Sequence, residues 1–347
     1  MRLLILFALA TCGVWAEQPA PVKVLSHRAG LAFVRFTDPR ENAFTTEVPK
    51  GWKTSGGLFR MASVDTRGVV ESVSPEGDIR VSAGDADVPP FTIPNQILSM
   101  GGFREGSWYS PGYGVRMMVR RYQPGVVFAE DYVRSKLGPK VGCSGVTITA
   151  KESRPDLTQS INALYAQFAA QGMKVREDAG AVWFSCTRNG QQWKGYYLAT
   201  TQISEGSGGG VWNAEHILGY AAASDKAGLA EAAMIHLASA MQVNPDWVKM
   251  QQGVTIATSQ IVAKTNEQIS TTIRKTFENK WKTDDEIFRR DTNARRGVTD
   301  VLDPTTGESW TVQNASNHYW RKPGSDVIVG TQTYDSPGVG YEALLQH

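Results

Sequence analysis

The sequence predicts an α+β protein: an antiparallel sheet with flanking helices, then a long helical arm and a small β-rich C-terminal unit. Short apolar alternations between turn residues fill residues 22–94 and return near the C-terminus, which predicts strands. An apolar stripe of helical period covers residues 157–168, and the pattern becomes long, polar and helical after Pro245. We therefore expect a domain over residues 17–250, an arm over 251–293 and a tail over 294–347.

The sequence of the first part of this domain predicts short strands joined by tight turns. Residues 43–48 alternate between apolar and polar side chains, as a half-buried strand does. Residues 69–73 and 78–81 flank Ser74-Pro75-Glu76-Gly77, which predicts a hairpin with proline at the second turn position. Strand character returns over residues 114–120.

Two segments have the periodicity of amphipathic helices. Five apolar residues at helical spacing mark the first: Leu157, Ile161, Leu164, Tyr165 and Phe168. Asp156 is the predicted N-cap, and Gly172 stands where a C-terminal stop belongs. A second helix is expected from Asp225 to about Met241, with four residues facing inward: Ala230, Ala233, Met234 and Leu237.

Three strands are expected between these helices, over residues 181–186, 193–201 and 211–222. The last two are joined by the glycine-rich stretch 204–210, which we interpret as a flexible hairpin loop. A phosphate-binding P-loop would need Gly-Lys-Ser/Thr leading into a helix, whereas Val211 and Trp212 open a strand.

The arm and the tail differ in pattern. A narrow apolar stripe runs along the arm, so this helix is expected to lie across another surface: Ile261, Ile269, Ile273, Phe277 and Trp281. The tail predicts four short strands over residues 298–302, 309–312, 318–320 and 327–331. About fifty residues are marginal for an independent domain, so the tail is expected to dock on another part of the chain.

The N-terminus predicts export. Arg2 precedes an apolar run over residues 3–10, and Val14-Trp15-Ala16 provides a signal-peptidase site, so residues 1–16 form the expected signal peptide. The mature protein would then be periplasmic or secreted. An alternative is a lipoprotein anchored at Cys12, because residues 9–12 approximate a lipobox.

Two cysteines remain after the leader, Cys143 and Cys186. In an oxidising compartment they predict one disulfide that closes a loop of about forty residues. The alternative is two separate buried thiols. A redox-active pair is not indicated, because the CxxC spacing is absent.

The composition of the 347-residue chain argues against several classes of function. The 36 basic residues nearly balance the 34 acidic ones, and no basic cluster indicates nucleic-acid binding. No apolar run after residue 16 is long enough for a transmembrane segment. The five histidines lack metal-binding spacing, so we expect neither a metal nor a cofactor.

Three segments are characteristic: residues 44–52 (FTTEVPKGW), the hairpin turn at 74–77, and the late helix at 229–241 before Asn244-Pro245-Asp246-Trp247. On these segments, residues 33–251 resemble the PsbP-like family of exported α+β domains. The resemblance implies an antiparallel sheet with helices on its faces, and protein binding rather than catalysis. The arm and tail lie outside it, and the tail is similar to a segment of uncharacterised bacterial exported proteins.

Large rings concentrate in the tail, where we place the candidate binding residues: Trp310, His318, Tyr319, Trp320 and Tyr334. Aromatic side chains with a polar end often anchor protein interfaces or glycans, but they can equally form the core of a small β unit. Strand alternation would turn His318 and Trp320 to one side and Tyr319 to the other.

These observations predict an exported, non-enzymatic binding or protein-interaction module. The alternative is an exported hydrolase whose site combines distant residues, such as His216 or His318 with a carboxylate. Two further nucleophile or acid candidates, Ser144 and residues 284–286, lack the surrounding motif of a known catalytic site. A third possibility is a carrier of a small apolar ligand, which requires a cavity.

Overall fold

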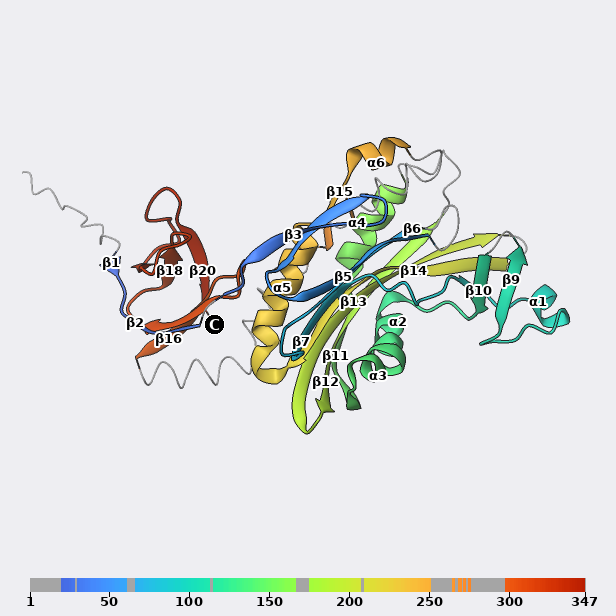
Figure 1. Cartoon of the computed structure of the whole chain (residues 1–347), viewed down its shortest axis with the longest axis horizontal. Helices are drawn as coiled ribbons and strands as arrows, with labels where there is room; N and C mark the ends of the chain where they lie inside the picture. Colours follow the sequence, from blue (N-terminus) through green and yellow to red (C-terminus); the bar gives the residue numbers. More distant parts are fainter. Residues whose placement is uncertain are drawn as a thin grey trace, which may run out of the picture. The chain divides into compact units, whose positions relative to one another are not determined.

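The computed structural model divides into a larger and a smaller unit (Figure 1). It describes residues 20–28, 30–60, 66–112, 115–166, 175–206, 209–250, 264–265, 268–269, 271–272, 274–275 and 297–346. The predicted signal peptide, Cys12, Gly172 and most of the predicted arm lie outside these residues. The larger unit spans Ala29–Trp281 with Thr305–Glu308, and the smaller unit spans Met1–Arg28, Lys282–Pro304 and Ser309–His347.

An antiparallel sheet forms the centre of the larger unit. Its strand order is β11 (Ser144–Ser153), β12 (Arg176–Arg188), β13 (Gln191–Gly206), β14 (Gly209–Ala223), β7 (Ile79–Ala83), β6 (Thr66–Val73) and β5 (Lys53–Arg60). Three shorter strands extend it: β8 (Phe91–Thr92), β9 (Trp108–Gly112) and β10 (Val115–Val119). A second, three-stranded sheet contains β3 (Phe33–Thr37), β4 (Phe44–Pro49) and β15 (Gln242–Val243).

Both faces of the main sheet are buried, so successive residues of one strand enter different cores. On β12, Ala181 and Trp183 belong to a first core, whereas Val182 and Phe184 belong to a second. The first core receives α4 (Pro155–Ala166), α5 (Ala227–Ser239) and residues of β4. The second receives α2 (Gly125–Tyr132), the π-helical turn Val133–Leu137 and α3 (Gly138–Val141) (Figure 1).

The short helices are α1 (Gln96–Met100), α6 (Pro245–Met250) and a 3₁₀ turn at Ser224–Lys226. Among the described helices, none combines the length and apolarity that crossing a bilayer requires. The predicted α+β class is confirmed. The pairs along the path from β11 to β5 are antiparallel, whereas β8 and β10 pair in parallel.

A close approach of backbones fixes α2 on the sheet. A Cβ atom on Gly180 of β12 would lie 2.3 Å from the backbone nitrogen of Val126, and one on Gly125 would lie 2.7 Å from the carbonyl oxygen of Ala199. Only glycine fits at such distances, so these two glycines set the spacing between helix and sheet.

The hairpin predicted at residues 69–81 is present as β6 and β7. The Ser74 hydroxyl accepts hydrogen bonds from the backbone N–H groups of Asp78 and Ile79, at 3.1 and 2.9 Å. Gly77 donates its N–H to the carbonyl oxygen of Ser74 and has a φ of 70°, a conformation that favours glycine. The sequence therefore contains the turn chemistry that this connection needs.

Two local predictions differ from the structure. Helix α4 begins at Pro155, so Asp156 lies in the first turn, where its carboxylate pairs with Arg154 at 3.0 Å instead of acting as the N-cap. Proline suits the first helical position because its missing N–H has no helical partner there. The β13–β14 ladder continues to the pair Gly206–Gly209, so most of the loop predicted at 204–210 is strand.

The smaller unit is built around one seven-stranded sheet. Its order is β1 (Ala20–Pro21), β19 (Ile328–Thr331), β18 (His318–Arg321), β20 (Glu342–Gln346), β16 (Val298–Leu302), β17 (Ser309–Gln313) and β2 (Val24–Arg28). Residues 20–28 thus belong to the sheet of the tail and not to the domain predicted over 17–250. The Val22 N–H donates to the carbonyl oxygen of Ile328 in β19, and the Lys23 carbonyl oxygen accepts a hydrogen bond from the N–H of Gln313 in β17. Residues 20–28 therefore supply the strands at both ends of this sheet.

Candidate functional site

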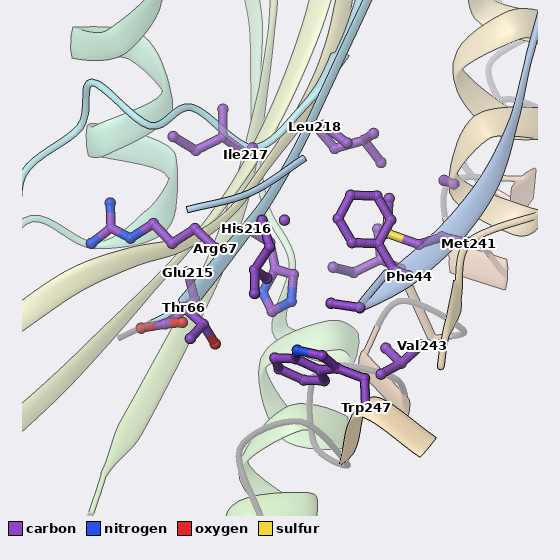
Figure 2. Close-up of a pocket in the computed structure, with 17 residues that line it drawn as sticks. Phe44, Thr66, Arg67, Glu215, His216, Ile217, Leu218, Met241, Val243 and Trp247 are labelled. Atoms are coloured by element: carbon purple, nitrogen blue, oxygen red, sulfur yellow. The ribbon is translucent and has the colours of Figure 1, made fainter. Parts of the chain in front are cut away.

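A cavity of about 100 Å³ lies inside the larger unit, against the first core (Figure 2). Apolar side chains from β4, β5, α6 and the residues near α5 line most of it: Phe44, Leu58, Met241, Val243 and Trp247. Ile269, one of the described helical residues between 264 and 275, closes another part of the wall and is 2 % exposed. The cavity is therefore a feature of one unit and is largely hydrocarbon-lined.

A β-bulge in β14 brings polar side chains to this wall. Thr200 pairs with His216 and Thr201 pairs with Ala214, so Glu215 is the extra residue of the ladder. Alternation would place Glu215 and His216 on opposite faces, yet both line the cavity. The bulge therefore turns the side chains of Glu215 and His216 toward the same cavity, and β-bulges are common beside functional sites.

His216 has one ring nitrogen bonded and the other free of a described partner. Its Nδ1 lies 3.0 Å from the Thr200 hydroxyl, within hydrogen-bond reach. Its Nε2 is buried and has no hydrogen-bond partner among the described residues. Burial lowers the pKa of His216 to about 4, so its imidazole is neutral at neutral pH.

A buried polar cluster continues from Thr200 across the neighbouring strands. Gln202 donates its amide hydrogens to the Tyr165 hydroxyl and, at 3.3 Å, to the Glu177 carboxyl. Burial, followed by the negative charge of Glu215, raises the pKa of Glu177 to about 8. Most Glu177 carboxyls are therefore protonated at neutral pH, and the cluster is polar without a full charge.

The remaining polar groups near the cavity are turned to other partners. The Trp247 indole N–H donates to Glu41 Oε2 at 2.9 Å. The indole ring lies beside His216 in the cavity wall (Figure 2). Arg67 donates to the Val88 carbonyl oxygen, and its guanidinium extends away from His216 in the same view. The sequence names His216 as a candidate residue but does not locate this cavity; the one signal for it is the change of apolar phase on β14 between Ala214 and Ile217.

The structure sorts the five tail rings into two groups. Trp310 and Tyr319 are 3 % and 1 % exposed and lie in the core of the smaller unit. His318 and Trp320 instead contact Tyr334, with ring centroids 5.2 and 5.5 Å apart. Alternation along β18 places His318 and Trp320 on one side and Tyr319 on the other, as expected. We call His318, Trp320 and Tyr334 the ring surface.

The predicted disulfide partners meet. Cys143, just after α3, and Cys186 of β12 have their sulfur atoms at bonding distance and their Cα atoms 5.7 Å apart. In the part of the chain that the structure describes, no group of three or more His, Cys, Asp or Glu residues could hold a metal ion.

The histidines of the hydrolase hypothesis have other contacts. His216 bonds to Thr200, and His318 packs edge-on against Tyr334. Among the described residues, a close histidine–carboxylate pair is formed instead by His236 and Glu47, whose Nε2 and Oε2 atoms are 2.6 Å apart. The Phe33 ring stacks on the His236 imidazole. Ser144 donates its hydroxyl to the Thr187 carbonyl oxygen at 3.2 Å, and residues 284–286 lie outside the described residues.

No protein-family model matches the chain, and no curated protein matches it.

Proposed function

We propose that this is an exported, non-catalytic binding protein whose larger unit holds a small, mostly apolar molecule in the cavity. The observation that carries the proposal is the buried His216 Nε2, which lacks a described partner beside a hydrocarbon-lined cavity. A buried polar atom without a hydrogen bond costs about 1–3 kcal/mol, so a ligand that bonds to it regains that energy. The disulfide supports export, because such bonds persist mainly in oxidising compartments.

The resemblance of residues 33–251 to PsbP-like domains agrees with a binding role. The contacts of His216 support it too, since its Nδ1 bonds to a threonine hydroxyl and not to the carboxylate that commonly orients a general base.

Filling the cavity is expected to abolish ligand binding. Ala238 lines the cavity from α5, and leucine in its place would occupy part of the empty volume. Small aromatic probes, toluene and phenol, should raise the melting temperature of the wild-type protein, since a ligand at a hundred times its Kd stabilises by about 2.7 kcal/mol. The Ala238→Leu variant should show little or no rise.

Calorimetric scans with and without each probe test this expectation. Ala166→Leu, at the exposed end of α4, is the matched control and should respond as the wild type does. An unchanged response of Ala238→Leu would place binding outside the cavity, and the absence of any response in the wild type would refute a small-ligand role.

The ring surface favours a second function, the binding of a macromolecular partner through the smaller unit. Tyr334 is 70 % exposed while its ring packs against His318 and Trp320, so a large amphipathic ring is presented to solvent. Exposed rings of this kind supply much of the energy of protein interfaces.

Tyr334→Ala should therefore weaken crosslinked capture of a partner from the native envelope and medium at least tenfold without changing the melting temperature. Trp320 is less suitable for this test, because it is 6 % exposed and donates a hydrogen bond to Thr331. Tyr341→Ala, a partly buried ring in the same unit, is the control. Equal capture by the Tyr334 and Tyr341 variants would exclude the ring surface.

A further inference from the structure

We infer that the ligand of the cavity is a small neutral alcohol or phenol whose hydroxyl hydrogen-bonds to His216 Nε2. The inference rests on the proposed function and adds the chemical class of the ligand. It follows from the bonding of the imidazole, the charges around it and the size of the cavity.

The bonding of His216 leaves Nε2 buried without a partner among the described residues, so a ligand could bond to it. Thr200 Oγ1 either accepts a hydrogen bond from Nδ1–H or donates one from its hydroxyl to Nδ1, and the protonation of Nε2 differs between the two cases. Nε2 is then an acceptor in the first tautomer and a donor in the second. A hydroxyl group satisfies both, because it donates one hydrogen bond and accepts others.

The surroundings of His216 disfavour an anionic ligand. Glu215 lines the cavity beside His216, and Glu177 interacts with both Thr200 and Glu215. The nearest cation of the wall, the Arg67 guanidinium, extends away from His216 in Figure 2 and bonds to the Val88 carbonyl. A carboxylate would therefore lose its hydration shell without gaining a cationic partner from the described part of the wall.

The accessible volume of the cavity also sets an approximate size for the bound part of the ligand, about one ring. An engineered apolar cavity of about 150 Å³ binds benzene, and the cavity here is of similar order, about 100 Å³. Its walls include the rings of Phe44 and Trp247, which suit the flat face of an aromatic ring. Phenol and short alcohols fit this size.

Three probes of nearly equal size test the inference by titration calorimetry: phenol, toluene and benzoate. The wild-type protein should bind phenol at least tenfold more tightly than toluene, because toluene leaves Nε2 unpaired. Benzoate should bind more weakly than either. In His216→Phe the preference should reverse, with toluene binding more tightly than phenol, because the phenol hydroxyl would then be buried without a hydrogen-bond partner.

A second readout does not depend on the folding of that variant. In the wild-type protein, phenol should shift the ¹⁵N resonance of His216 Nε2, whereas toluene at equal saturation should leave it unchanged. Equal affinity for phenol and toluene, or tighter binding of benzoate, would overturn the inference and leave the proposed function in place. If none of the probes binds, both are wrong.

Discussion

Replacing Cys143 by serine together with Cys186 by alanine should lower the free energy of unfolding of the larger unit by about 4 kcal/mol. The bond joins residues 43 positions apart, and removing it returns the corresponding loop entropy to the unfolded chain. The melting temperature should fall by roughly 10 °C, as expected for a unit of this size.

The position of the disulfide makes β11 the first element to loosen. β11 is the terminal strand of the main sheet, pairs only with β12 along the path, and has mostly exposed or partly buried side chains. Cys186, by contrast, is 3 % exposed in the second core. The bond therefore ties a weakly buried edge strand to a strongly buried one, next to the pair Ser144–Thr187.

Hydrogen exchange and thermal scans in the presence and absence of reductant measure both effects. Amide protection in β11 should decrease before that in β12 and β13. Ser144→Ala, which keeps both sulfur atoms, is the control and should remain sensitive to reductant. A wild-type protein whose melting temperature does not change on reduction would contradict the prediction.

Features with local causes could be predicted from the sequence. The β6–β7 hairpin depends on Ser74, Pro75 and Gly77 within one turn, and the buried side of α4 follows from residues at helical spacing, among them Leu157 and Ile161. Such features need no knowledge of distant parts of the chain, which is why they were accessible from the pattern alone.

Features that depend on distant pairings could not be predicted. β1 and β2 belong to the sheet of the tail because Pro21 pairs with Val329 and Trp310 pairs with His27, across nearly the whole chain. A short strand has no sequence signal for the identity of its partner. The strand β20 was missed for the same reason, since Glu342–Gln346 is defined by its pairing with β16 and β18.

The candidate site was only partly accessible. Alternation separated Tyr319 from His318 and Trp320 correctly, because that rule is local to one strand. The cavity depends on empty space between β4, α5 and β14, and on a single bulge at Glu215. Empty volume has no signal in composition or spacing, and the change of apolar phase between Ala214 and Ile217 marks the bulge without showing that a cavity lies beside it.

The second large effect concerns pH, through the buried carboxyl of Glu177. Burial raises its pKa to about 8 from an ordinary value of 4.5. Tyr165 from α4, Thr200 and Gln202 from β13, and Glu215 from β14 surround the group, and the Glu215 charge further favours the protonated form. The unfolded chain loses this proton near pH 4.5, whereas the folded protein keeps it up to about pH 8.

The sign of the effect follows from proton binding. Between pH 4.5 and 8 the folded state binds more protons than the unfolded state, so the free energy of unfolding falls as the pH rises. The opposite contribution of His216, whose pKa is lowered from 6.5 to about 4, is mostly gained below pH 6.5 and adds only about 0.4 kcal/mol above it. From pH 6.5 to 8, Glu177 should therefore account for a loss of about 2 kcal/mol.

Glu177→Gln should remove this loss, because the amide keeps the shape of the side chain and does not ionise. Urea unfolding at pH 6.5, 7.25 and 8 compares the slopes of the wild-type and variant proteins. Glu76→Gln, at an exposed position in the β6–β7 turn, is the control and should retain the wild-type slope. If Glu177→Gln retains it too, another group causes the pH dependence, and the cluster beside Thr200 and His216 is ionised at neutral pH.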